Sequence, residues 1–254
     1  MYPRELYSLA DDGFILRRKN DSAITSYCVR GERSSGTNFL DALMASGTDL
    51  DIANMGWKHG FYRPTIQPPS MLVLGIIRHW KPWLVSMYRK PWHTSRNMHS
   101  KSFSDFIREP WDSYMIPEGN LDDDRHRLGH VIFSDRDPLS LGRIPNVVQL
   151  RNMKNRNLFG ILNLDCNIIL MKYEWLNENP SYLSTILRNE FDISVKADFT
   201  PIDMRFADKY DMFNDIRPEN VANFCADDIT DTDLNFIRWN LNARQEGILG
   251  YRLF

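Results

Sequence analysis

The segment Gly31-Glu32-Arg33-Ser34-Ser35-Gly36-Thr37-Asn38 constrains the fold of this chain more than any other stretch. It follows a short β-like run at residues 24–30 and precedes an apolar pattern of helical spacing. Two glycines separated by four residues match the spacing of a P-loop, in which backbone N–H groups and a helix N-terminus bind phosphate oxygens. The segment therefore predicts a phosphate-binding turn between a strand and a helix.

The lysine of a usual P-loop is missing from this segment. Thr37 stands where that lysine would reach the terminal phosphates of ATP, and the loop holds no other lysine. A kinase or ATPase is therefore disfavoured, and we expect a different phosphate donor.

A second phosphate contact is predicted where the apolar run at residues 71–77 ends. Such a near-continuous run is typical of a buried strand, and Arg78 follows it directly. Pro82 suits the first turn of a helix, which would present Ser86 about one turn further on. An arginine fork together with a hydroxyl group forms a phosphate site.

These motifs resemble those of the sulfotransferases that use 3'-phosphoadenosine 5'-phosphosulfate as donor. In that family a loop of the Ser-Gly-Thr type binds the 5'-phosphosulfate, and an arginine followed eight residues later by a serine binds the 3'-phosphate. Both motifs occur here in the same order, and residues 168–176 with Asn179-Pro180 are similar to the family's strand with Tyr-Glu-x-Leu. The resemblance covers residues 24–190. It implies the bacterial-type branch and an α/β fold, a three-layer sandwich around a central parallel sheet.

The resemblance also implies which residues bind the donor. They are Arg33, Ser34, Ser35, Gly36, Thr37, Asn38, Phe39, Arg78 and Ser86. Ser34 stands where many relatives carry a basic residue, so Arg33, one position earlier, is the candidate to contact the departing phosphate. Phe39 stands where relatives stack an aromatic ring on adenine, although its position beside Leu40 equally suits the core. The glycine-rich, lysine-ended C-terminal motif of the cytosolic members is absent from residues 240–254.

Sulfuryl transfer requires a base for the proton of the acceptor and donors for the charge that develops on the leaving phosphate. It requires no metal. In Gly56-Trp57-Lys58-His59-Gly60, His59 is predicted as the general base because an imidazole accepts a proton near neutral pH. Lys58 would stabilise the bridging oxygen or anchor an anionic acceptor. The alternative is that this segment is only a polar loop. Glu32 is a competing base, disfavoured because a carboxylate facing a dianionic donor is repelled.

The wider pattern predicts one α/β domain over residues 1–254. Strands are expected at residues 24–30, 71–77, 146–150 and 166–173, with a short edge strand at 14–16 and helices at 38–46, 82–90, 152–163 and 230–245. Residues 91–145 are proline-rich with one convincing helix near 103–108, and are expected to form an insertion or lid on the acceptor side.

A pair of basic residues and a pair of histidines lie outside these motifs, and the function of each pair is open. Arg151 and Lys154 either add positive charge at the edge of the sheet or form a solvated basic face. His126 and His130, beside three aspartates, superficially suggest a metal site, but no second ligand pair has suitable spacing.

Charge and composition bear on partners and location. The formal net charge of −2 provides no bulk electrostatic case for binding nucleic acid or an anionic membrane. The longest apolar stretch is too short to span a bilayer, and the N-terminus has no signal-peptide pattern, so we expect a cytoplasmic protein. Cys28, Cys166 and Cys225 are expected to be reduced thiols.

The expected partner is a small-molecule or saccharide acceptor, which the sequence does not identify further, and the oligomeric state is equally unreadable. Two other classes of protein stay open. A P-loop phosphotransferase would bind ATP with magnesium, and a non-catalytic nucleotide-binding protein would bind the donor without turnover.

Overall fold

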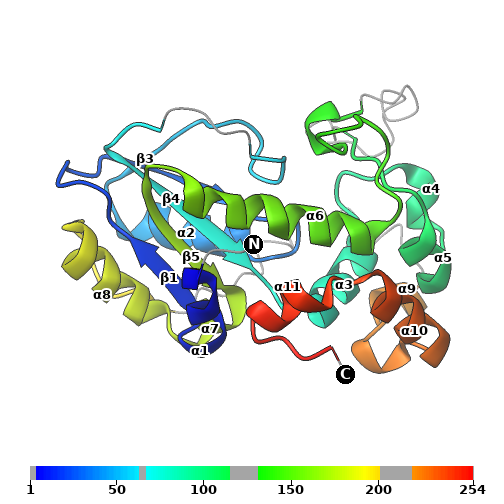
Figure 1. Ribbon diagram of the computed structural model, residues 1–254. Helices are drawn as coiled ribbons and strands as arrows, with labels where there is room; N and C mark the ends of the chain where they lie inside the picture. Colours follow the sequence, from blue (N-terminus) through cyan, green and yellow to red (C-terminus); the bar gives the residue numbers. More distant parts are fainter. Residues whose placement is uncertain (1–3, 63–66, 115–130, 201–218, 254) are drawn as a thin grey trace. The chain divides into compact units, whose positions relative to one another are not determined.

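The computed structural model describes residues 4–62, 67–114, 131–200 and 219–253 (Figure 1). The chain divides into two compact units. The first comprises residues 1–79, 155–204 and 244–254, and the second comprises residues 80–154 and 205–243. Each unit is described by itself, and a single domain over the whole chain stays a prediction.

A five-stranded sheet forms the centre of the first unit, in the order β1-β5-β4-β2-β3 (Figure 1). Its strands are β1 (Phe14–Arg17), β2 (Ser26–Arg30), β3 (Asp51–Ile52), β4 (Met71–Ile77) and β5 (Asn167–Lys172). β1 pairs with β5 in the antiparallel sense, whereas all other neighbours are parallel. The predicted α/β class and the short edge strand near residue 14 are confirmed.

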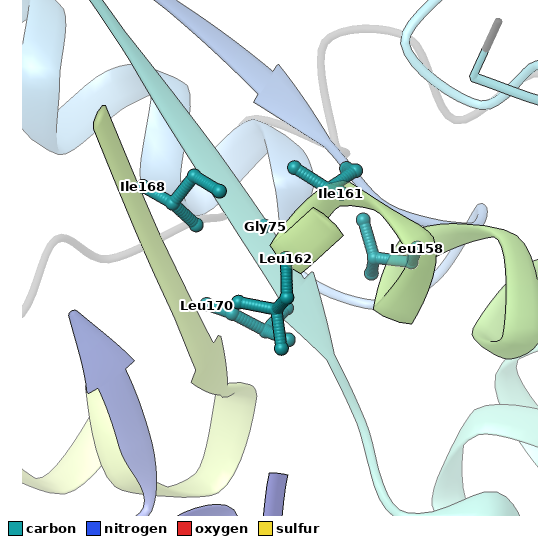
Figure 2. Close-up of a pocket in the computed structure, with 6 residues that line it drawn as sticks. All are labelled: Gly75, Leu158, Ile161, Leu162, Ile168 and Leu170. Atoms are coloured by element: carbon teal, nitrogen blue, oxygen red, sulfur yellow. The ribbon is translucent and has the colours of Figure 1, made fainter. Parts of the chain in front are cut away.

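Helices cover both faces of this sheet. Successive strand residues point to opposite sides, so the continuous apolar runs of β4 and β5 place apolar side chains on both faces. On one face, Val29, Leu74 and Ile169 belong to a buried core shared with α2 (Thr37–Gly47) and α8 (Pro180–Phe191). On the other face, strand residues line a small apolar pocket together with residues from the end of α6 (Val147–Phe159) and from η4 (Gly160–Asn163). Figure 2 shows its lining: Gly75, Leu158, Ile161, Leu162, Ile168 and Leu170. The result is the predicted three-layer sandwich.

Residues 146–150 form the start of a helix, so the strand predicted there is wrong. Asn146 accepts the N–H of Gln149 with Oδ1 (2.9 Å) and the N–H of Leu150 with its carbonyl (3.0 Å), which is the geometry of an N-cap. A short apolar run such as Val147-Val148 does not distinguish a strand from a buried helix. The capping asparagine is the signal that does.

Shorter elements complete the first unit. They are η1 (Arg4–Tyr7), α1 (Ser8–Asp11), α7 (Tyr173–Glu178) and most of α11 (Ala243–Ile248). The C-terminal helix predicted over residues 230–245 is two helices, because α10 (Asp231–Asn240) ends before α11 begins. Thr230 caps α10, since its side chain accepts the N–H of Asp233.

The second unit is helical in its described parts. It contains α3 (Trp80–Arg89), α4 (Arg96–His99), α5 (Phe103–Arg108), η3 (Phe133–Asp135), the larger part of α6, α9 (Glu219–Ala222), η6 (Ala226–Asp228) and α10. Tyr88 contacts the rings of Phe103, Phe106 and Phe224, which form an aromatic core. Residues 91–145 belong to this unit, and their role as an acceptor-side lid stays a prediction.

Arg151 and Lys154 are buried inside this second unit, so the interpretation as a solvated basic face is wrong. Arg151 lies over the ring of Trp83 at 5.3 Å, and Lys154 pairs with the buried carboxylate of Asp135. Both lie within α6, and the interpretation in which they add positive charge at the edge of the sheet stays a prediction. His126 and His130 fall outside the described residues.

The structure also bears on membrane-spanning helices and on the cysteines. Within the described residues, no helix combines the length and apolar character needed to cross a bilayer. Cys28 and Cys166 are buried, Cys225 is exposed, and all three are free thiols.

Candidate functional site

The carboxyl ends of three parallel strands bring the sequence motifs of the first unit to one edge of the sheet. β4 and β5 end side by side, since Ile77 pairs with Lys172, whereas β2 ends two residues earlier, where Arg30 pairs with Gly75. Gly31, Arg78 and Tyr173 directly follow the three ends. In open α/β sheets ligands bind outside this edge.

The loop between β2 and α2 has the backbone of an anion-binding turn. Gly36 is the N-cap of α2 with φ 95°, and Ser34 also has a left-handed φ of 61°. No side chain in the described part of the chain caps this helix, and its first turn has no acidic residue. Its first N–H groups therefore carry the partial positive charge that attracts an anion.

Glycine is required at Gly36 because Tyr173 lies directly against it. A Cβ atom at position 36 would lie 2.3 Å from Cδ2 of Tyr173. The same tyrosine ring meets Phe39 edge-on, with 6.2 Å between the ring centroids. Tyr173 therefore forms a wall beside the loop.

Arg78 connects the loop to the end of β4. Its Nη1 donates to the carbonyl oxygen of Ser34 at 3.0 Å, and its guanidinium lies 4.9 Å from the centroid of Tyr173. The side chain stays partly exposed at this edge. Ser86, its predicted partner for the 3'-phosphate, lies in α3 of the second unit, and its contribution to the same site stays a prediction.

Glu174 holds the corner behind Arg78, a role that the sequence analysis did not identify. Its Oε1 accepts the backbone N–H of His79 and its Oε2 accepts the hydroxyl of Tyr251, both at 2.8 Å. The rings of His79 and Tyr251 lie 4.8 Å apart. The C-terminal segment therefore helps to fix the backbone that follows Arg78. The Tyr-Glu pair at residues 173–174 was the available signal.

Lys172 adds a partly buried cation beside this corner. Its Nζ donates to the carbonyl oxygen of Ala10 at 3.3 Å and lies 5.7 Å from the centroid of the Tyr251 ring. Burial lowers the pKa of Lys172, although the negative charges of Glu174 and Asp11 oppose that effect.

His59 approaches the loop from the segment that follows β3. Its Nδ1 lies 2.9 Å from the carbonyl oxygen of Gly31. Because a carbonyl oxygen only accepts, Nδ1 carries the proton in the neutral ring, and the lone pair is on Nε2. This tautomer gives Nε2 the lone pair that a general base requires.

Lys58 brings a cation to the first turn of α2. Its Nζ donates to Oδ1 of Asn38 at 2.8 Å and pairs with the carboxylate of Asp41. Its carbonyl oxygen accepts the N–H of Gly31 at 3.3 Å. A lysine, which the loop itself lacks, is therefore supplied from a different segment.

Arg33 and Glu32 form a buried pair within the loop. Oε1 of Glu32 accepts both the backbone N–H and the Nε–H of Arg33, each at 2.7 Å. The Arg33 side chain is 2% exposed, and its guanidinium lies 5.3 Å from the Trp57 ring. In this arrangement the arginine predicted to meet the departing phosphate pairs with Glu32 instead.

The remaining predicted donor residues differ in exposure. Ser35 and Thr37 are buried, Ser34 and Gly36 are half-buried, and Asn38 is exposed. Phe39 is 5% exposed and belongs to the core between the sheet and α2. Its packing matches the core interpretation rather than the one in which it stacks on adenine.

The described residues contain no group of three or more histidine, cysteine or acidic side chains placed to hold a metal ion. Comparisons of the chain with models of protein families, with curated proteins and with solved structures find no match.

Proposed function

We propose that the protein is a sulfotransferase that moves a sulfuryl group from 3'-phosphoadenosine 5'-phosphosulfate to a hydroxyl or amine of a small-molecule or saccharide acceptor. The observation that carries the proposal is the contact between Arg78 and the carbonyl oxygen of Ser34. It joins a second cationic group to a loop that already has an open helix N-terminus. A donor with phosphates at both ends of its ribose needs two such subsites.

In this proposal the loop holds the 5'-phosphosulfate. Backbone N–H groups at the start of α2 and the hydroxyls of Ser35 and Thr37 would bind its oxygens. Arg78 would bind the 3'-phosphate through charge-assisted hydrogen bonds. The Tyr173 ring would hold the Arg78 guanidinium in place from behind.

The transfer step uses residues beside the loop. The acceptor oxygen or nitrogen attacks sulfur, the bond between sulfur and the bridging phosphate oxygen breaks, and Nε2 of His59 takes the acceptor's proton. Lys58 would stabilise the negative charge that develops on the bridging oxygen. The contacts of both residues with Gly31 support this placement.

The test is a binding measurement on the full chain with 3',5'-adenosine bisphosphate and, separately, with ATP and magnesium. We expect the bisphosphate to raise the thermal midpoint and ATP to leave it unchanged, because a ligand that binds only the native state stabilises it. Absence of any shift with the bisphosphate, checked by calorimetry, would exclude the proposed donor.

Two alternatives each have one supporting observation. The Lys58 ammonium at the first turn of α2 supplies a cation such as a phosphotransferase needs, and stabilisation by ATP with magnesium would favour that class. The internal pairing of Arg33 with Glu32 favours a non-catalytic nucleotide-binding protein. Bisphosphate binding without sulfate transfer to any of a panel of phenols and saccharides would support the latter.

A further inference from the structure

The carboxylate of Glu32 occupies two donors that an anion-binding loop would offer to a ligand. One is the backbone N–H of Arg33, which belongs to the loop itself, and the other is the Nε–H of the Arg33 guanidinium. Both donate to the same carboxylate oxygen at 2.7 Å. Short, charge-assisted contacts of this kind are the ones that phosphates and sulfates make in such loops.

The pair is buried but incompletely satisfied. Glu32 is 7% exposed, and its second carboxylate oxygen has no hydrogen-bond partner among the residues that the structure describes. A buried carboxylate needs partners for both oxygens to offset its lost hydration. The contact between Glu32 and Arg33 therefore stabilises the loop only in part, because one buried carboxylate oxygen lacks a hydrogen bond.

We propose that Glu32 is a specificity-determining residue whose carboxylate acts as an internal substitute for the ligand's anion. The proposal rests on the loop being the anion site of the proposed function. A ligand must displace this carboxylate from Arg33 before it takes the same two donors. Anions with two or more charges near the loop compete well with a single carboxylate, whereas singly charged anions do not.

The geometry next to the pair allows this exchange. Ser34, the next residue, already has a left-handed backbone, and the buried Arg33 guanidinium lies against the ring of Trp57, which is itself half-buried. Displacement of the carboxylate would make the Nε–H of Arg33 available to the leaving phosphate. Arg33 could then both pair with Glu32 in the absence of ligand and contact the departing phosphate when the donor is bound.

The decisive variant is Glu32→Gln, which keeps the shape of the side chain and removes its charge. The probes are inorganic pyrophosphate and 3',5'-adenosine bisphosphate, with affinities measured by calorimetry at one ionic strength. We expect pyrophosphate to bind at least about tenfold more tightly than to the unmodified protein, which corresponds to about 1.4 kcal/mol. Glu178→Gln, an exposed carboxylate on α7, is the control for net charge.

Two further variants guard the test. Glu32→Asp keeps the charge on a shorter side chain that reaches Arg33 less well, so its affinity for pyrophosphate should rise by less than that of Glu32→Gln. This variant keeps the inference testable if Glu32→Gln folds poorly. The double variant Glu32→Gln with Arg33→Gln should lose the gain, because the released donor is gone. Thermal unfolding without ligand verifies that each variant is folded.

The outcomes separate this inference from the proposed function. Unchanged or weaker binding in Glu32→Gln, an equal gain in Glu178→Gln, or no pyrophosphate binding to any variant would each overturn the inference. Pyrophosphate could bind more tightly to Glu32→Gln while the bisphosphate binds neither to this variant nor to the unmodified protein. In that case the proposed donor is wrong, but the role of Glu32 as an internal substitute for the anion is upheld.

Discussion

The guanidinium of Arg78 lies 4.9 Å from the centroid of the Tyr173 ring. The same ring approaches the position where Gly36 would carry a Cβ atom. One aromatic side chain at the end of β5 therefore determines both the position of an arginine that follows β4 and the residue type allowed in the loop that follows β2. The site is a product of three strand ends that share one edge of the sheet.

Replacement of Arg78 by alanine should weaken binding of 3',5'-adenosine bisphosphate at least tenfold. The reason is the loss of charge-assisted hydrogen bonds worth about 1.5–3 kcal/mol. Arg78→Lys should restore only part of this affinity, because an ammonium lacks the planar fork. Calorimetry measures both. The matched control is Arg188→Ala, which removes an exposed ion pair between Arg188 of α8 and Asp198, and an equal loss there would refute the assignment.

Gly36→Ala should destabilise the protein more than Gly56→Ala. Both glycines have positive φ, 95° and 80°, so both alanines incur the left-handed backbone cost of roughly 1–2 kcal/mol. Only Gly36 faces a neighbour at 2.3 Å, whereas nothing lies within 4 Å of a Cβ at Gly56. Urea unfolding compares the two. Equal losses of free energy would show that Tyr173 does not restrict the loop.

His59→Gln should lower sulfate transfer by about 10²–10⁴-fold, the usual contribution of a general base. Binding of the bisphosphate should survive, since His59 would contact the acceptor rather than the donor. Transfer of labelled sulfate to a panel of phenols and saccharides, with calorimetry in parallel, separates the two effects. Asn54→Ala, an exposed position in the same segment, should keep full activity. Retained turnover in His59→Gln would exclude its role as base.

Stability should fall between about pH 8.5 and pH 11 because of Cys166. Burial raises the pKa of its thiol to about 11 in the folded protein, whereas an unfolded thiol ionises near 8.5. In that window the unfolded state has lost a proton that the native state keeps, so rising pH favours unfolding by about 1–2 kcal/mol at pH 10.

Cys166→Ala tests this assignment through the difference in unfolding free energy between pH 7.5 and pH 10. That difference should shrink in the variant, whatever the alanine costs at neutral pH. Cys225→Ala, at an exposed thiol, should leave it unchanged. An unaltered difference in Cys166→Ala would assign the alkaline destabilisation to other groups, such as Tyr27, whose pKa burial raises to about 12.

Local signals in the sequence determined much of the first unit. The glycine spacing at residues 31–36 predicts the turn before α2, and the apolar run at residues 71–77 predicts β4 with its observed bounds. Both signals depend on neighbouring residues alone: a glycine allows a left-handed turn, and an apolar run indicates a buried strand. The strand predicted at residues 146–150 failed because a short apolar run suits two structures.

Only the tertiary structure decided how the site is held. Tyr173 meets Gly36, and Tyr251 meets Glu174, across long stretches of chain that no local pattern relates. Parallel pairing of β2, β4 and β5 brings their carboxyl ends together, and the burial of both sheet faces selects that pairing. The burial of Arg33 against Trp57 is equally a tertiary effect, because it depends on where the segment after β3 packs. Sequence determined which groups are present, and packing determined which of them face one another.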